Sequence, residues 1–380
     1  MKQISNFGIF TLLLVSSLTI MVGTVIAPAL SGIVEHLNFK YSPGLLITLP
    51  SLGVVVFASF IGRLLNKIGS FKLLCLGLIP YAILGVIGAF ITNDYLLMFD
   101  RFLLGGATVA VQVSVTSFIA DFFKGTDRMK LIAWQGMAIE LGGVVFLSIG
   151  GVLGEWHWQY PFYIYLIAIL CLFLVMKNLS QLKKIEGLKD ATEIPAKEHK
   201  RKVKLVFYAS MSAMVLFFVG FVTLPIYLPK VLSFSESTTG YYMAFISLIA
   251  IITASQMPKA VGKFGDAKTV CLGFIFFMFG YSCLASSGSI TVLMISAIFI
   301  GIGFGFTIPL LNHMMIEASS NQNLGKNLGL YSMGVFGGQF LATFIEYISH
   351  DYAVIYGCGA VLALVIGVIL FYAFKRVEVD

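Results

Sequence analysis

The segment NKIGSFKLLCLGLI, residues 66–79, returns 196 residues later as GKFGDAKTVCLGFI, residues 262–275, with seven of fourteen positions identical. Other matches at an offset of 196 or 197 follow in chain order. They pair residues 22–28 with 219–225, Gly44 with Gly240, Ser51 with Ser247, Ala58 with Ala254, Ser59 with Ser255, Gly105 with Gly301, Asp121 with Glu317, Lys130 with Lys326, and Met137 with Met333. A common offset across five segments is hard to obtain by chance. The chain is therefore predicted to consist of two similar halves.

The composition indicates a membrane protein. Hydrophobic residues make up 58% of the 380 residues and charged residues 11%, whereas about a quarter of a soluble domain is charged. The apolar residues come in long runs, and a run of about 20 matches the hydrocarbon core of a bilayer. We expect an all-α polytopic fold with twelve transmembrane helices, at residues 7–30, 43–65, 72–92, 96–118, 131–152, 158–177, 205–226, 238–258, 269–287, 290–312, 327–347 and 353–374.

These twelve spans predict a domain organisation in three parts. Residues 1–178 form an N-terminal six-helix bundle, residues 179–204 a basic cytoplasmic connector, and residues 205–380 a C-terminal six-helix bundle. Because six is an even number, both halves enter the membrane in the same orientation. A parallel repeat of this kind is found in secondary transporters, where the two halves rock around a central solute site.

The basic residues predict the orientation. With both termini in the cytoplasm, 22 of the 25 Lys and Arg residues fall on the cytoplasmic side, as the positive-inside rule requires. The net charge of +7 is thus a topology signal, and no nucleic-acid partner is needed to explain it. We expect a monomeric multi-pass protein in contact with the lipid of a cell membrane, and the short loops and small size favour a bacterial plasma membrane.

Three motifs resemble those of the major facilitator superfamily. GRLLNKIGSFK, residues 62–72, is similar to that family's signature loop between helices 2 and 3, although Asn66 stands where the family usually has an acidic residue. DRFLLGG, residues 100–106, resembles its helix 4 arginine motif. GGVLGEWHWQYPFYIY, residues 150–165, resembles the end of helix 5 and the start of helix 6 in drug:proton antiporters. The resemblance implies a major facilitator fold and bacterial drug:proton antiport.

The fourth predicted span carries a polar stripe at helical spacing. Arg101 is followed on the same face by Thr108, Gln112 and Thr116. A charge within a span is costly and seldom left without a reason. One interpretation is a face for solute or proton coupling. The other is that Arg101 lies near the outer interface, extends toward water and pairs with Asp100.

Glu140 is the acidic residue that lies deepest in a predicted span. A carboxyl group there can carry a proton, so Glu140 is the first candidate for proton coupling, together with Arg101 and Asp100. Gly136, Gly143 and Gly151 share its face, however, and small residues on one face often mark a helix–helix contact. Glu140 could equally lie neutral and hydrogen-bonded in such a contact.

The remaining candidates divide into two groups. Polar residues expected to line a substrate cavity, besides the stripe of the fourth span, are Gln135, Asn312 and Gln339. Residues at predicted cytoplasmic ends are expected to act in gating through loop contacts and weak salt bridges. These are Arg63, Asn66, Lys67, Gly69, Asp121 and Glu317.

The leading hypothesis is a secondary transporter that moves a small organic solute by alternating access, most simply as proton-coupled efflux of a drug or metabolite. A proton-coupled uptake symporter is the alternative. A membrane sensor or enzyme without transport is the alternative from another class. The sequence has no HExxH, no GxxxxGK[ST] and no metal-spaced Cys or His pairs. We therefore expect no enzymatic activity, no cofactor and no metal, with protons and a small molecule as partners.

Overall fold

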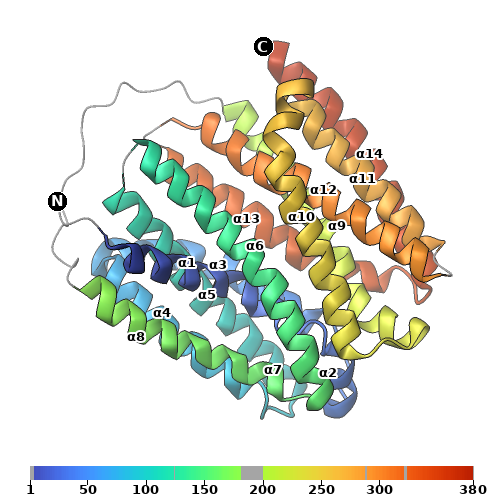
Figure 1. Ribbon diagram of the computed structural model, residues 1–380, viewed down its shortest axis with the longest axis horizontal. Coiled ribbons are helices and arrows are strands. Elements are labelled where there is room, and N and C mark those ends of the chain that lie inside the picture. Colours follow the sequence, from blue (N-terminus) through green and yellow to red (C-terminus); the bar gives the residue numbers. More distant parts are fainter. Residues whose placement is uncertain (1–3, 124, 181–199, 287–288, 321–322, 380) are drawn as a thin grey trace. The chain divides into compact units, whose positions relative to one another are not determined.

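The computed structural model describes residues 4–123, 125–180, 200–286, 289–320 and 323–379, and these residues form helices without any strand (Figure 1). The expected all-α fold is confirmed. The helices are α1 (Asn6–Thr24), α2 (Leu30–Leu37), α3 (Leu45–Ile68), α4 (Ser70–Ile87), α5 (Asp94–Phe122), α6 (Gly125–Trp156), α7 (Tyr160–Tyr163), η1 (Ile164–Leu166), α8 (Ile167–Leu179), α9 (Lys200–Leu232), α10 (Glu236–Phe264), α11 (Asp266–Ala285), α12 (Ile290–Glu317), α13 (Leu324–Ala342), η3 (Thr343–Tyr347) and α14 (Tyr352–Val379).

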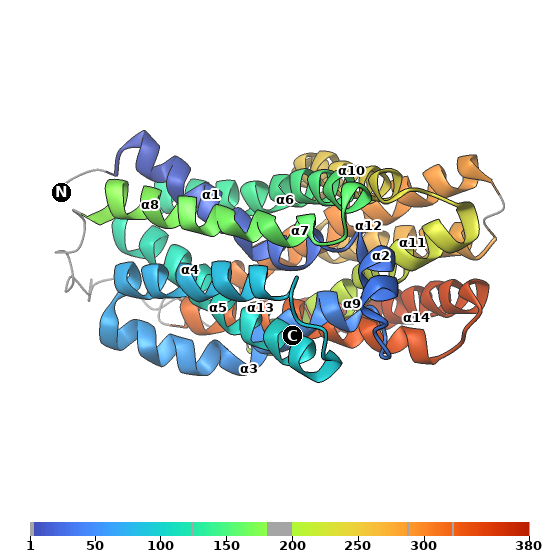
Figure 2. The ribbon, with the colours of Figure 1, turned by 90° about the horizontal axis from the view of Figure 1, so that it is seen from below.

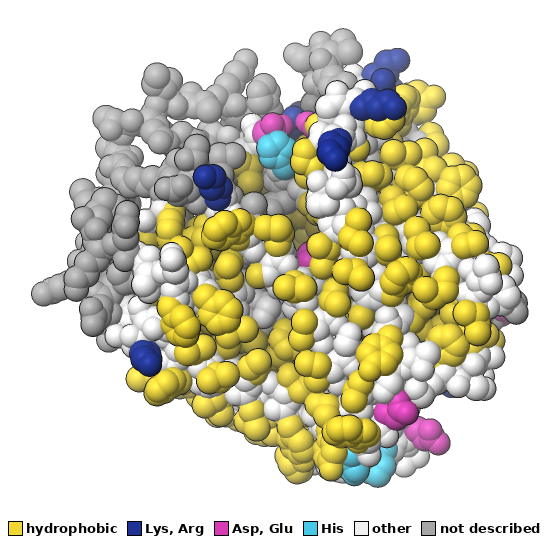
Figure 3. Space-filling model, in the orientation of Figure 1, with side chains coloured by type: hydrophobic (Ala, Val, Ile, Leu, Met, Phe, Trp, Pro, Cys, Tyr) yellow, Lys and Arg dark blue, Asp and Glu magenta, His cyan; other side chains and the backbone are white. Residues whose placement is uncertain are grey.

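Twelve helical segments in the described parts of the chain are long and apolar enough to cross a membrane. Hydrophobic side chains cover most of the face that Figure 3 shows, and most of the charged side chains lie toward its upper and lower edges. Many buried hydroxyl groups bond to helix carbonyls, which satisfies them where lipid offers no partner. Tyr81, for example, donates to the carbonyl of Leu18 at 2.6 Å, and Tyr165 donates to that of Val22 at 2.7 Å.

Contacts divide the chain into two compact units. The first comprises Met1–Asp190 and Leu228–Tyr241, and the second comprises Ala191–Tyr227 and Tyr242–Asp380. In the first unit α3 and α4 pack on α5, α6 packs on α1, and α8 packs on α4 and α1 (Figure 2). In the second unit α11 packs on both α12 and α14. The predicted connector at residues 179–204 falls largely on residues 181–199, outside the described residues.

The repeat is visible in the backbone at the two segments that first indicated it. Gly69 joins α3 to α4 with φ 80° and ψ 161°, and Gly265 joins α10 to α11 with φ 82° and ψ 165°. Both dihedral pairs lie where residues with a side chain are strained. The same turn is thus built twice, 196 residues apart, with glycine at the position that requires it.

Close helix contacts repeat at the same offset. Gly105 of α5 lies against Pro50 and Gly53 of α3, and Gly301 of α12 lies against Ile246 and Ile249 of α10. Likewise, Gly77 meets Ala110 as Gly273 meets Phe306, and Gly142 meets Ser17 as Gly338 meets Met214. The two units therefore pack equivalent helices at equivalent positions. The sequence repeat thus corresponds to a repeat of helix contacts.

The first predicted span, residues 7–30, was too long. Helix α1 ends at Thr24, residues 25–29 form turns and a bend, and the separate helix α2 begins at Leu30. Pro28 explains the break, because proline has no N–H for a helical hydrogen bond and disfavours the helical conformation in the preceding residue. The sixth predicted span is likewise composite, since α7, η1 and α8 follow one another within it.

Candidate functional site

Arg101 and Asp100 form a buried ion pair near the start of α5. The Nη2 atom of Arg101 lies 2.7 Å from Oδ2 of Asp100, and the side chain of Arg101 is fully buried. Nη2 also donates to the carbonyl oxygen of Leu84 at 2.9 Å. The guanidinium carbon lies 5.4 Å from the ring centre of Phe162 and 5.6 Å from that of Tyr165. Arg101 therefore joins α5 to α4, α7 and η1 inside the first unit.

This geometry bears on both interpretations of Arg101. The pairing with Asp100 is present, but the side chain is enclosed by protein and does not reach an exposed interface. Along the same stripe Thr108 is buried, and its hydroxyl donates to the carbonyl of Leu104. Only Gln112 and Thr116, farther along α5, are partly exposed.

Three of the predicted cavity residues lie together between α5 and α6. The Nε2 atom of Gln135 lies 3.5 Å from the hydroxyl oxygen of Thr116 and is placed to donate to it. The Thr116 hydroxyl in turn donates to the carbonyl oxygen of Gln112 at 3.0 Å. Amides and hydroxyls of this kind both donate and accept hydrogen bonds, so the cluster can orient an uncharged polar group of a solute.

Glu140 lies on the α6 face that also carries Leu147 and Gly151, at spacings of seven and eleven residues. Its side chain is partly exposed, and no described residue forms a hydrogen bond or an ion pair with its carboxyl group. A side chain at Gly136, one turn earlier, would meet no atom within 4 Å. Gly151, by contrast, packs closely on Gly240. The face is therefore in tight contact near the end of α6 and open at Gly136, and Glu140 between them is partly exposed.

In the second unit, the predicted residues at the end of α12 belong to a charged cluster. The Nε2 atom of His313 lies 3.1 Å from Glu317, and the ammonium group of Lys202, on α9, lies 3.8 Å from the same carboxylate. Asn312 is partly exposed beside them, whereas Gln339 of α13 is buried. Glu317 thus connects α12 to α9.

The candidate gate residues of the first unit lie at helix ends. Arg63, Asn66 and Lys67 are exposed on the last turns of α3, directly before the turn at Gly69. Asp121 is exposed near the end of α5 and accepts a hydrogen bond from the Ser117 hydroxyl at 3.2 Å.

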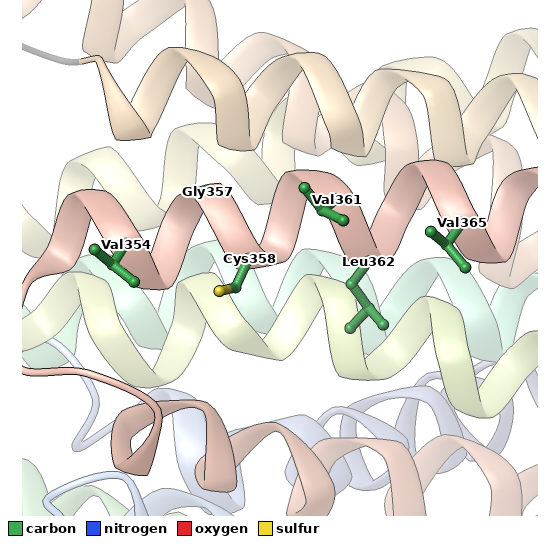
Figure 4. Close-up of a pocket in the computed structure, with 6 residues that line it drawn as sticks. All are labelled: Val354, Gly357, Cys358, Val361, Leu362 and Val365. Carbon is green, nitrogen blue, oxygen red and sulfur yellow. The ribbon is translucent and has the colours of Figure 1, made fainter.

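A surface pocket in the second unit runs along α14 (Figure 4). Small and apolar residues line it: Val354, Gly357, Cys358, Val361, Leu362 and Val365. None of the predicted polar candidates contributes to this pocket. Its lining offers only apolar contact, so it does not supply the polar groups that a solute site requires.

Sequence reasoning missed two carboxyl groups at helix ends. Glu155 of α6 accepts a hydrogen bond at 3.1 Å from the backbone N–H of Ser237 in α10. Glu236 lies beside Gly32 of α2 and Gly154 of α6. A sequence signal for the start of α10 does exist, because the Ser235 side chain caps it by accepting from the N–H of Thr238. No sequence signal indicated that these helix ends would meet.

Known proteins show similarity along the whole chain. The sequence model of the Major Facilitator Superfamily matches residues 12–343 and, in an overlapping match, residues 257–380. Multidrug resistance protein 2 of Bacillus subtilis (strain 168) is 23% identical over 97% of this chain and 96% of its own length. Tetracycline resistance protein, class B, of Escherichia coli is 26% identical over 73% of this chain and 72% of its own length.

Solved structures agree with the family match. The crystal structure of peptide transporter POT in complex with sulfate aligns with a TM-score of 0.78 at 16% identity, over 99% of this chain and 96% of that chain. The crystal structure of a D-xylose-proton symporter aligns with a TM-score of 0.69 at 17% identity, over 95% and 97%. At these identities the structures show the fold. With the family match across the sequence, they establish that the chain is a multi-pass membrane transporter of the Major Facilitator Superfamily.

Proposed function

We propose that this transporter exports a small organic solute in exchange for protons. The observation that carries the proposal is the match over 97% of the chain to a protein named for multidrug resistance. The match to a tetracycline resistance protein supports the same proposal. Both termini are proposed to lie in the cytoplasm, because 22 of the 25 basic residues then lie on that side.

Glu140 is proposed as the proton-coupling carboxyl group. An ionised carboxylate within a bilayer is costly unless it is paired or reached by water. Glu140 is partly exposed and has no partner among the described residues. Its charge is therefore free to respond to whichever side of the membrane supplies water and protons. Binding of a proton and binding of a solute near this group would then exclude one another, which is the basis of exchange.

The hydrogen-bonded residues Gln112, Thr116 and Gln135 are proposed to contact the solute in the first unit. In the second unit, Asn312 and Gln339 are proposed as polar residues that contact the solute. A small number of polar groups in an otherwise apolar lining can orient a ligand and still accept ligands of different shapes. Such a lining favours amphipathic or lipophilic organic compounds. Arg101 and Asp100 are proposed to act indirectly, by fixing α5 against α4 and η1.

Accumulation of a fluorescent cationic dye such as ethidium in cells tests the direction of transport. Cells that express the protein are expected to accumulate less dye than cells with an empty vector, and a protonophore should abolish the difference. Increased accumulation would indicate the uptake symporter. A panel of dyes and antibiotics that shows no difference in either direction would contradict export of lipophilic compounds as the function of this transporter.

A further inference from the structure

A short segment of the second half of the sequence belongs to the first unit. Residues Leu228–Tyr241, at the end of α9 and the start of α10, group with residues 1–190, although the sequence on both sides of them belongs to the second unit. Gly240 lies so close to Leu147 and Gly151 that a side chain at Gly240 would collide with the backbone of both. This segment is therefore held by direct backbone packing on α6.

The carboxyl group of Glu236 fills space that two glycines leave open. A side chain on Gly32 of α2, or on Gly154 of α6, would collide with the carboxyl oxygens of Glu236. The backbone N–H of Gly32 donates a hydrogen bond to this carboxyl group. The residue before α2 is Ala29, which cannot cap a helix, and no side chain of α2 itself does so. Glu236 thus supplies from α10 the acceptor that the start of α2 lacks.

Glu155 performs the reciprocal role. It lies on α6 and accepts from the N–H of Ser237, in the first turn of α10, while the hydroxyls of Ser235 and Ser237 also hydrogen-bond to it. A carboxylate at a helix N-terminus is favoured by the helix dipole. One carboxylate therefore holds the start of α10 and the other holds the start of α2. Figure 1 shows α2 and α7 close together near the end of α6.

We propose that Glu236 is a positioning residue that latches residues 228–241 onto α2 and α6 of the first unit. Any motion that moves residues 228–241 away from α2 and α6 must withdraw its carboxyl group from between Gly32 and Gly154. The Oε2 atom is buried and has no hydrogen-bond partner among the described residues. An unpaired buried oxygen raises the free energy of the latched state. Release of the latch, which exposes this oxygen, is therefore easier. The role of this latch in transport rests on the proposed alternating-access function, but the contact itself does not.

Cross-linking measures the latch directly. In a chain whose five native cysteines are replaced by alanine, the double substitution E155C/S237C places thiols on α6 and α10 where these helices meet. The rate of cross-linking by a short thiosulfonate reagent, measured in membranes, reports how often residues 228–241 lie against α6. All variants share this background, so the loss of Glu155 is common to all of them.

Gly32→Ala is the most specific variant, because the three atoms nearest to a methyl group there all belong to the carboxyl group of Glu236. Alanine by itself favours the helix over glycine, so any loosening must come from the displaced carboxyl group. We expect Gly32→Ala and Glu236→Ala each to lower the cross-linking rate about fivefold, the effect of losing one ordinary helix cap. Glu236→Gln should keep the rate within about twofold of the parent, since its amide oxygen can still accept from Gly32.

The combination Gly32→Ala/Glu236→Ala should lower the cross-linking rate no further than either change alone, because both changes act on one contact. Glu35→Gln, an exposed carboxyl group on α2, is the matched control and should have no effect. Thermal unfolding in detergent checks that each variant folds. Unchanged rates in Gly32→Ala and Glu236→Ala, or effects that simply add, would overturn the latch. Cross-linking requires neither solute nor proton gradient, so this result is independent of whether proton-coupled export is correct.

Discussion

At the scale of single residues, Glu140 provides the test of coupling. Glu140→Gln retains the shape and removes the proton-binding charge, so we expect proton-driven transport to fall at least tenfold, while solute binding persists. Positioned acid–base groups in enzymes contribute factors of this size or larger. Gradient-driven uptake into everted vesicles and solute-induced shifts in melting temperature separate the two effects.

The matched control for Glu140 is Glu35→Gln, which removes an exposed carboxyl group of α2 and should leave transport at the level of the parent protein. Full gradient-driven transport by Glu140→Gln would exclude Glu140 as the coupling residue.

The buried pair of Arg101 and Asp100 makes a prediction about stability. Arg101→Ala leaves the Asp100 carboxylate buried without its partner, and breaking a buried ion pair in this way costs about 3–5 kcal/mol. The double variant Asp100→Ala/Arg101→Ala leaves no unpaired charge, so it should be more stable than Arg101→Ala alone. Melting temperatures of the purified variants measure the difference. A double variant that is less stable than Arg101→Ala would argue against the pair as the source of the effect.

At the scale of helices, the repeated glycine contacts predict equal effects in the two halves. Gly105→Ala would place a methyl group against the carbonyl of Pro50, and Gly301→Ala would place one against Ile246 and Ile249. Overpacking of this kind costs about 1–3 kcal/mol. Gly262→Ala, where no atom lies within 4 Å of the added methyl group, is the control and should not be destabilised. A lowered melting temperature in only one of the two repeat variants would contradict equivalent packing.

The sequence allowed the helices to be predicted well, because apolar runs of membrane length leave few alternatives. The hydropathy pattern gave a wrong helix boundary in the first span. The apolar run of the first span continues to Leu30, but Pro28 interrupts its backbone hydrogen bonding, and α2 begins as a new helix. Hydropathy alone does not predict this break, because the residues around Pro28 are themselves apolar.

At the scale of the whole molecule, the twofold repeat was predictable because two identical glycine turns require the same residue at the same place. The equal dihedrals of Gly69 and Gly265 confirm it. Contacts between helices were not predictable. The hydrogen bond of Gln135 to Thr116 and the insertion of Glu236 between Gly32 and Gly154 depend on which helices meet. Helical spacing identifies a face, but it does not identify the neighbour of that face.

Exchange across a membrane tests the central claim most directly. Purified protein in proteoliposomes with an acidic interior, supplied with a labelled solute identified in the cell assay, is monitored for solute entry and internal pH together. Because exchange runs in either insertion orientation, we expect solute to accumulate inside while the interior loses protons faster than in protein-free vesicles. Solute that accumulates only when the interior is alkaline, entering together with protons, would contradict proton-coupled export.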